Sequence, residues 1–229
     1  MSVRTDNILE TMKTKTLLLA VALAGAGAVS GVAQTVYSVN AVGFVNVVIP
    51  PLPAGPNSFS ILSNPLDAAD NSVAALFPNA PLGSAIYKFV GGAFVANNRG
   101  FTAWSSPAMT LVPGEAFFFR NPSATQFTNT FVGEVKQGTG ANALTTPLVG
   151  GFQLVASQVP QSGLVSTDLG LPIALGEAVY RFQSGAYLTF NRGFTTWSPS
   201  EPTIQAGEGF FLKKNPNPAN WVRNFSVNQ

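Results

Sequence analysis

The chain has 229 residues, of which 46% are hydrophobic and only 10% are charged, and its formal net charge is +2. An ordinary soluble domain has about 25% charged residues, so this chain offers few side chains for acid–base catalysis. It also lacks the dense basic surface that nucleic acid requires. Cysteine and histidine are both absent, which excludes disulfides, the usual Cys or His zinc sites and a Ser-His-Asp triad. We therefore expect no catalytic residue, no metal, no cofactor and no nucleic-acid partner.

Residues 1–33 have the pattern of a secretory signal peptide. Lys13 and Lys15 precede an uncharged stretch, TLLLAVALAGAGAVSGVA, which begins leucine-rich and ends in small residues, as a cleavable leader does. Cleavage at the end of this stretch leaves a mature chain that begins at Gln34, and Met12 is an alternative start. The stretch is shorter than the roughly 20 apolar residues of a spanning helix, so we expect export rather than an uncleaved anchor. No transmembrane segment is expected in the mature chain.

A leader without disulfides suits a bacterial periplasm or exterior better than a eukaryotic secretory route. We therefore expect a secreted protein, and the choice between periplasm and exterior stays open.

The most informative feature of the mature chain is an internal repeat. The sequence of residues 82–118 recurs at 175–211, 93 positions later and without a gap. Of the 37 aligned pairs, 19 are identical. Each copy must bury a face against something, so a repeat of this kind predicts two matching structural units. The predicted organisation begins with an N-terminal β-strand segment at residues 34–52. Two β units follow, at residues 53–135 and 147–229, and a Gly/Asn/Thr-rich linker at residues 136–146 joins them.

Within each unit, short alternating apolar runs bounded by turn residues predict β-strands. In the first unit the expected strands are residues 58–62, 85–90, 93–96, 115–120 and 127–132. Glycines in VGG at 90–92 and QSG at 183–185 predict hairpin turns, because glycine takes a positive φ without strain. A single helical turn is expected at 72–77. The fold class is therefore all-β, with two tandem small β-sandwich or barrel-like units after a signal peptide.

One strongly β-prone stretch starts at Val36, ends at Ile49 and has no clear counterpart before the second unit. An edge strand that packs on the first unit or bridges both units is the simpler interpretation, because an intramolecular partner avoids the entropic cost of association. The alternative is strand donation to a neighbouring molecule, which would allow self-association into a fibre or layer.

Several segments of the mature chain resemble a β-rich domain that recurs in secreted bacterial proteins, particularly those of Verrucomicrobia-like organisms. They are QTVYSVNAVGFVNV after the leader, SILSNP at 60–65, IYKFVGGAF at 86–94, LVPGEAFFFRNP at 111–122 and TFVGEVKQG at 130–138. The second unit departs from this pattern, with LVASQVP and NFSVNQ at the corresponding places. The resemblance implies an exported, non-catalytic surface protein of uncharacterised function.

An arginine and a glutamate are kept in both copies of this charge-poor protein. Arg99 and Glu115 in the first unit correspond to Arg192 and Glu208 in the second. A guanidinium can bind a carboxylate through two hydrogen bonds and so fix two loops. We therefore predict two structural ion pairs, Arg99 with Glu115 and Arg192 with Glu208.

Aromatic residues near the conserved Asn-Arg-Gly-Phe segments define a candidate ligand site. Aromatic faces stack on sugar rings and asparagine amides bind hydroxyls, so each unit could hold one carbohydrate site. Core packing is the competing interpretation, because an aromatic residue at alternating positions of a small β domain usually fills its interior. The candidate ligand residues are Trp104, Trp197, Asn98, Asn191, Tyr87 and Tyr180.

The acidic residues do not form a recognisable catalytic or metal-binding set. Glycoside hydrolysis needs two carboxyl groups about 5 to 9.5 Å apart, and each unit has only one acid that matches between copies. Calcium prefers 6 to 8 oxygen ligands, and Asp67 with Asp70 is more simply a turn and a helix cap.

These observations predict an exported, non-catalytic structural or interaction protein of the cell surface or extracellular space. A carbohydrate-binding module with one aromatic site per unit is the first alternative, and a self-assembling fibre or layer subunit is the second. Polysaccharide and other surface proteins are the expected kinds of partner.

Overall fold

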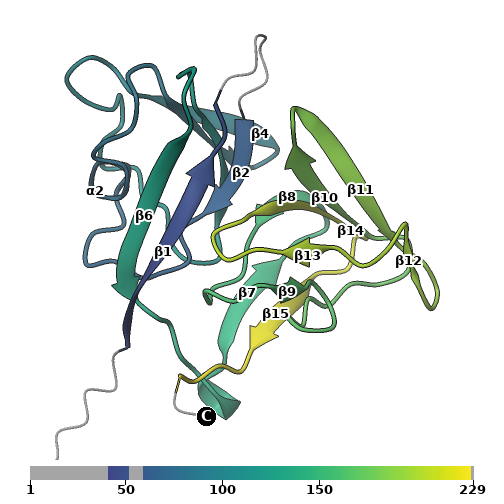
Figure 1. Cartoon of the computed structure of the whole chain (residues 1–229). Coiled ribbons are helices and arrows are strands. Elements are labelled where there is room, and N and C mark those ends of the chain that lie inside the picture. Colours follow the sequence, from purple (N-terminus) through teal and green to yellow (C-terminus); the bar gives the residue numbers. More distant parts are fainter. Residues whose placement is uncertain (1–40, 52–58, 228–229) are drawn as a thin grey trace, which may run out of the picture. The chain divides into compact units, whose positions relative to one another are not determined.

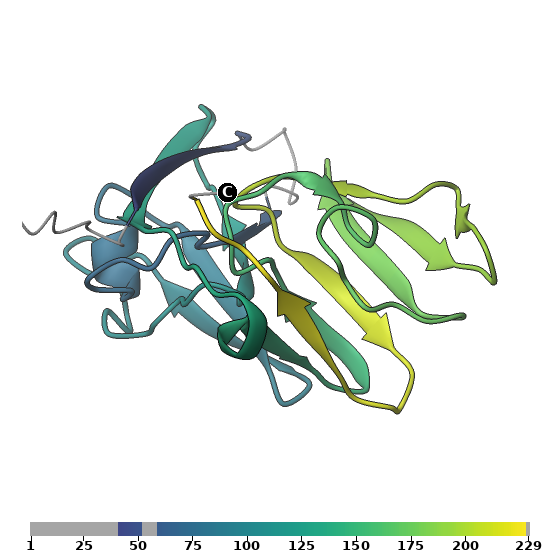
Figure 2. The same ribbon diagram turned by 90° about the horizontal axis from the view of Figure 1, so that it is seen from below.

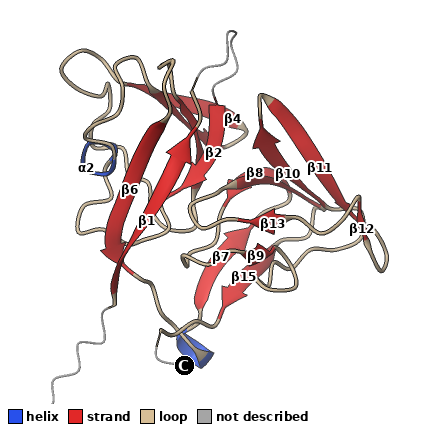
Figure 3. Ribbon diagram, viewed as in Figure 1, coloured by secondary structure: helices blue, strands red, loops and turns tan. Residues whose placement is uncertain are grey.

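Antiparallel strands dominate the computed structural model, which describes residues 41–51 and 59–227 (Figure 3). The predicted leader and residues 34–40 of the predicted N-terminal segment lie outside the described residues. The described residues belong to one compact unit, residues 40–229. Within them, helical structure consists of one turn of α-helix, α2 (Val73–Leu76), and one 3-10 turn, η1 (Gly140–Asn142). The expectation of an essentially all-β chain is thus confirmed.

The first sheet has four strands in the order β2-β5-β3-β4, of which β2 and β4 are labelled in Figure 1. The central hairpin turns at Gly91 and Gly92, whose φ angles are 60° and 85°. Two consecutive positive φ values characterise the hairpin turn that matches the twist of the flanking strands, so the predicted turn is confirmed. The strands lie close to their predicted positions: β2 (Phe59–Ser63), β3 (Ala85–Val90), β4 (Ala93–Asn98) and β5 (Ala116–Arg120).

The second sheet repeats this strand order with one additional short strand, β12-β11-β10-β14-β8. Its central hairpin turns at Ser184 and Gly185, again with positive φ at both positions. Strands at matching sequence positions therefore occupy matching places in the two sheets. The strands are β8 (Gly151–Val155), β10 (Ala178–Gln183), β11 (Ala186–Arg192), β12 (Trp197–Ser198) and β14 (Phe210–Lys214).

A two-stranded ribbon accompanies each sheet. β1 (Val42–Ile49) pairs with β6 (Phe127–Glu134) over its whole length, and the two run alongside each other in both views (Figures 1 and 2). β7 (Leu144–Leu148) pairs with β15 (Ala219–Arg223) in the same antiparallel manner. A further short pair joins β9 (Gly163–Leu164) to β13 (Thr203–Ile204).

The ribbons differ from the sequence prediction in one respect. The segment predicted as a linker, residues 136–146, contains η1 and the start of β7. In the second half β7 precedes β8, just as β1 precedes β2 in the first half. The N-terminal strand therefore has a counterpart. It was missed because LTTPL is short and contains a proline, which lowers the strand signal.

None of the sheets formed by the described residues closes into a barrel, so the barrel-like alternative is wrong. The edge of β2 that does not pair with β5 bonds to the other half of the chain instead of to β4. Ser63 N donates to Gly207 O at 2.9 Å, and at the matching place Ala156 N donates to Gly114 O at 3.1 Å. Both glycines have positive φ, which glycine adopts without strain. The two sheets are thus joined edge to edge by matching backbone hydrogen bonds.

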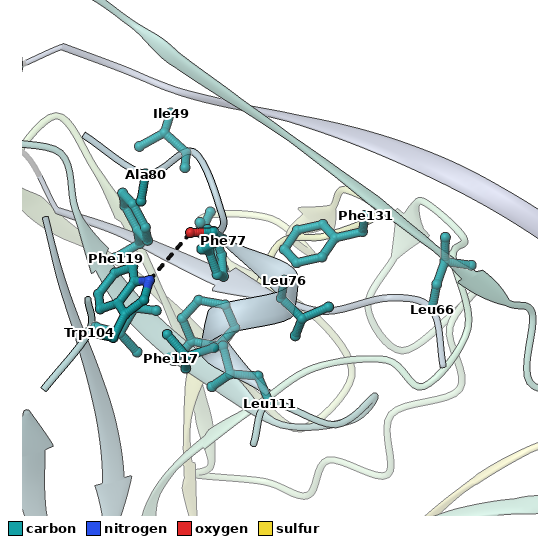
Figure 4. Close-up of a cluster of buried hydrophobic side chains, with 13 residues drawn as sticks. Ile49, Leu66, Leu76, Phe77, Ala80, Trp104, Leu111, Phe117, Phe119 and Phe131 are labelled. Carbon is teal, nitrogen blue, oxygen red and sulfur yellow. Dashed lines mark hydrogen bonds between the residues drawn. The ribbon is translucent and has the colours of Figure 1, made fainter. Parts of the chain in front are cut away.

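Three apolar clusters form the interior, and strand periodicity decides which residue enters which cluster. On β5, Phe117 and Phe119 point into the first cluster together with Trp104 and Phe77 (Figure 4), whereas Phe118 points into the third. Successive side chains of a strand point to opposite faces, and β14 divides its residues in the same way between the second and third clusters. The third cluster lies between the two sheets and takes residues from both.

The predicted helical turn is confirmed at α2. The Ser72 hydroxyl accepts a hydrogen bond from Ala75 N, which caps the turn. Asp70 supports the cap, because its carboxylate accepts from Ser72 N at 2.8 Å.

Candidate functional site

Ten aromatic rings gather on the face between the two sheets, together with a few aliphatic side chains, and we call these rings the aromatic interface. Its members come from five positions of the first sheet and the five positions 93 residues later in the second. All ten are aromatic. They are Phe59, Tyr87, Phe89, Phe94 and Phe118 in the first sheet, and Phe152, Tyr180, Phe182, Tyr187 and Phe211 in the second.

The rings pack in a pattern that repeats with exchange of the two halves. Phe118 and Phe211, which occupy matching positions, lie with their centroids 5.9 Å apart. Each also meets a ring of the opposite sheet edge-to-face: Phe118 lies 5.5 Å from Phe182, and Phe211 lies 5.3 Å from Phe89. Edge-to-face contacts at these distances stabilise a ring pair beyond the area that it buries. The interface therefore has an approximate two-fold arrangement of contacts.

Two pockets open in the aromatic interface. Pocket one has a volume of about 400 Å³, and pocket two has a volume of about 330 Å³. Pocket one is lined by Phe59, Tyr87, Phe94, Phe118, Phe182 and Tyr187. Pocket two is lined by Phe89, Phe152, Tyr180, Tyr187 and Phe211. Every residue of pocket two is the repeat counterpart of a residue of pocket one, so each pocket draws on both halves of the chain.

The rims of the pockets carry rings that remain substantially exposed. Phe94 is 50% exposed, Tyr187 is 48% exposed and Phe152 is 52% exposed. Burial of the Tyr187 side chain is nevertheless sufficient to raise the pKa of its hydroxyl above the usual value of 10.0, because the protein desolvates the charged form. Tyr187, which lines both pockets, therefore carries an uncharged hydroxyl at neutral pH.

The six predicted ligand residues do not converge on one site. Trp104 is buried, and its Nε1 donates to Phe77 O at 3.3 Å in the first core cluster (Figure 4). Trp197 is half-buried, with the Arg192 guanidinium 5.8 Å from its ring centroid. Tyr87 lines pocket one and Tyr180 lines pocket two.

Asn98 and Asn191, the remaining two candidates, are exposed. Their strands pair with the segments that follow them: Asn98 N donates to the Ser105 hydroxyl, and Asn191 lies opposite Ser198 in the ladder of β11 and β12. Neither asparagine is among the lining residues of the two pockets.

The prediction of two ion pairs named the wrong cations, because neither Arg99 nor Arg192 binds the expected glutamate. Glu208 is bound by Arg181 through two hydrogen bonds, Nε to Oε1 at 2.7 Å and Nη2 to Oε2 at 3.0 Å. Glu115 is bound at the matching place by Lys88, whose Nζ lies 3.0 Å from both carboxylate oxygens.

The predicted partners lie elsewhere. Arg192 stacks over Trp197 and donates to Thr195 O, and Arg99 pairs with Trp104 across a bridge of the backbone. Arg99 and Arg192 are identical in the two copies, whereas the position that binds the glutamate keeps only its positive charge, as Lys88 in one copy and Arg181 in the other.

The carboxylates of the described residues support the backbone. Glu115 also accepts from Val112 N, and Glu208 also accepts from Gln205 N. Glu177 is 2% exposed and binds Lys214 at 2.9 Å. Other acids also accept hydrogen bonds, among them Asp67 from Asn71, Asp70 from Ser72, Asp168 from Leu164, and Glu201 from Ser166 and Thr167.

No group of three or more acidic, histidine or cysteine residues that could hold a metal ion occurs in the described part of the chain. Among the same residues, no helix is long and apolar enough to cross a membrane. Comparison with protein-family models, with curated proteins and with solved structures finds no match. The fold defines the chain as a β-rich protein of several antiparallel sheets, and its site is a pair of aromatic pockets.

The pockets were not predicted as such, although one signal pointed to them. Aromatic residues alternate along the central hairpins, at 87, 89 and 94 and again at 180, 182 and 187. An outward-facing aromatic stripe that recurs in both copies indicates a surface that has a partner.

Proposed function

We propose that this chain is an exported, non-catalytic interaction protein built from two matching, sandwich-like β units that share the aromatic interface. The observation that carries the proposal is the pair of pockets, because ten aromatic residues at matching positions of the two halves line them and no lining residue is a carboxylate or a lysine. Concave, mostly apolar sites with few polar groups are the usual form of ligand sites in proteins.

The bonding of the carboxylates supports the non-catalytic part of the proposal. Glu115 and Glu208 are the acids that match between the copies, and each is bound to a cation and to a backbone amide. A general acid or base needs a free position from which to exchange a proton with a substrate. Carboxylates held in this way favour a structural role.

Export rests on the sequence of the leader, which has two lysines, a leucine-rich stretch and a small-residue end. The resemblance to β-rich domains of secreted Verrucomicrobia-like proteins points in the same direction. We place the mature protein outside the cytoplasm, beginning at Gln34.

Carbohydrate binding is the second candidate function, and Tyr87 and Tyr180 favour it because they line equivalent pockets. The tryptophans weigh against it. A sugar platform needs an exposed ring face, whereas Trp104 is 5% exposed and Trp197 is covered in part by Arg192.

Two measurements test the proposal. Mass spectrometry of the protein recovered from the periplasm or medium is expected to give an N-terminus at Gln34. The purified protein is expected to hydrolyse 4-nitrophenyl acetate and 4-nitrophenyl glycosides no faster than buffer does. Turnover that falls on replacing Glu115 or Glu208 by Gln would overturn the non-catalytic assignment, and retention of the intact leader in the cytoplasm would overturn export.

A further inference from the structure

The two pockets retain exposed aromatic surface that a purely structural seam would bury. Phe94, Phe152 and Tyr187 are each about half exposed at the pocket rims, although burial of apolar area contributes about 25 cal/mol per Å². The same positions are aromatic in both halves, and the pockets that they line are equivalent. Aromatic surface kept open at two equivalent places therefore indicates a ligand that covers it.

The charges around the pockets indicate an uncharged ligand. The side chains that line both pockets are phenylalanine and tyrosine. The nearby cations of the central hairpins are already neutralised, Lys88 by Glu115 and Arg181 by Glu208. Transfer of an isolated ion from water to such an uncharged lining is costly. Lys213, beside pocket two, already lies over the Phe152 ring, so the lining favours an uncharged ligand over an anion or a metal ion.

A quaternary ammonium ion is the cation that aromatic cages bind most often, and pocket two argues against it. Lys213 Nζ lies 5.9 Å from the centroid of the Phe152 ring, which lines this pocket. The ring therefore already has a cation beside it, and a second positive charge would be repelled.

The polar atoms of the lining limit how many hydrogen bonds a ligand can form. Tyr87 and Tyr187 line pocket one, Tyr180 and Tyr187 line pocket two, and their hydroxyls are the side-chain polar groups of the lining residues. A sugar ring carries several hydroxyls that need partners in its plane, and hydroxyls buried without partners cost free energy. A flat ring with a single hydroxyl or carbonyl group matches this lining better than a sugar does.

We propose that each pocket binds one uncharged aromatic compound of one or two fused rings, packed among the phenylalanine rings with its polar group hydrogen-bonded to a tyrosine hydroxyl. The volumes of about 400 and 330 Å³ lie at the small end of the range of about 300 to 1,000 Å³ for ligand pockets. The inference rests on the proposed function, because it assigns a ligand class to the same non-catalytic site.

The test uses 2-naphthol, which is uncharged at pH 7, with the mature chain from Gln34. Titration calorimetry is expected to show saturable binding with two sites per chain. Phe94→Ala is expected to remove the site in pocket one and Phe152→Ala the site in pocket two, so each variant retains one site. Tyr187→Ala, which alters both pockets, is expected to weaken both sites about tenfold, which corresponds to about 1.4 kcal/mol.

Phe101→Ala is the matched control, because Phe101 is 89% exposed and lines neither pocket. It is expected to bind like the wild type. The three pocket residues are half exposed, so their variants are expected to keep the wild-type circular dichroism spectrum. Any variant that loses this spectrum is replaced by the milder Phe94→Leu, Phe152→Leu or Tyr187→Leu.

Three outcomes would overturn the inference. They are no saturable binding of 2-naphthol to the wild type, binding that all three pocket variants leave unchanged, and binding of cellohexaose or tetramethylammonium in the pockets in preference to 2-naphthol. Because 2-naphthol has no bond to hydrolyse, this result is independent of the turnover assay above, and failure of the ligand class is distinguishable from failure of the non-catalytic assignment.

Discussion

Replacing Glu208 by Gln removes the charge that neutralises Arg181, and this substitution is the sharpest test of the ion pairs. The Arg181 and Glu208 side chains are 16% and 17% exposed, and two short hydrogen bonds join them. Breaking one side of a buried pair costs about 3 kcal/mol, because the remaining charge is left without a partner in a poorly solvated place. For a chain of this size 1 kcal/mol corresponds to about 2 to 4 °C in the melting temperature, so we expect a decrease of about 9 °C.

The first half of the chain supplies an internal comparison. Glu115 is 38% exposed and its partner Lys88 is 17% exposed, so solvent screens this pair more strongly. Glu115→Gln is therefore expected to cost about 1 kcal/mol and to lower the melting temperature by about 3 °C. Arg181→Lys copies the Lys88 arrangement into the second half and is expected to fall between the wild type and Glu208→Gln.

The assay is thermal unfolding at low salt, followed by circular dichroism, with Arg192→Gln as the control. Arg192 stacks on Trp197 and does not bind Glu208, so its replacement is expected to shift the melting temperature much less than Arg181→Gln does. The reasoning is refuted if Arg192→Gln destabilises the protein as strongly as Arg181→Gln. It is also refuted if Glu208→Gln leaves the melting temperature unaltered.

Three further predictions concern the seam, the core and the pockets. Gly209→Ala would place a new Cβ 2.4 Å from Ala116 Cβ, so urea titrations are expected to show a free energy of unfolding lower by about 1 to 3 kcal/mol. Unchanged stability would contradict the close approach of Gly209 to Ala116. Acrylamide is expected to quench Trp197 far more than the buried Trp104, so Trp197→Phe should leave fluorescence that acrylamide hardly reduces, and strong residual quenching would contradict this burial. Burial raises the pKa of Tyr187, so the contribution of the protonated hydroxyl to stability is complete below about pH 10 and is lost as the pH rises through the raised pKa. Between about pH 9 and 11 the melting temperature should therefore fall less steeply in Tyr187→Phe than in the wild type. Parallel curves for the two proteins would refute the pKa shift.

The strands could be predicted from the sequence because their signals are local. Alternating apolar residues located β3, β4, β5 and β6 to within two residues, and the glycines at 91 and 92 located the hairpin between them. A period of two and a positive φ both depend on residues that are close in the chain. β7 has a weak local signal, a short segment with a proline, and its pairing depends on β15, about 75 positions away.

The partner of each glutamate could not be predicted, for a reason that is also physical. Lys88 and Glu115 lie on different segments, and only the pairing of β3 with β5 brings them together. Residue identity favoured Arg99, which occurs as arginine in both copies, whereas the structure conserves the positive charge at another position. A charge shared by Lys and Arg is the signal that would have found the pair.

The pockets could not be predicted because they arise between the sheets. Strand periodicity requires Phe118 and Phe211 to point to the face opposite that of Phe117 and Phe210, but it does not determine what covers them. Each meets the hairpin of the opposite half, and this arrangement follows from the hydrogen bonds of Gly114 and Gly207 across the sheet edges.

A seam between two like faces explains why the pockets come in pairs and belong to neither half alone. When equivalent surfaces pack about an approximate two-fold axis, each ring meets the partner of its own counterpart, as Phe118 meets Phe182 and Phe211 meets Phe89. Any gap on one side of the axis must then recur on the other with the residues exchanged. Separating the halves would destroy both pockets at once, so ligand binding and cohesion of the seam depend on the same rings. A bound aromatic compound is therefore expected to hold the two sheets together as well as to occupy them.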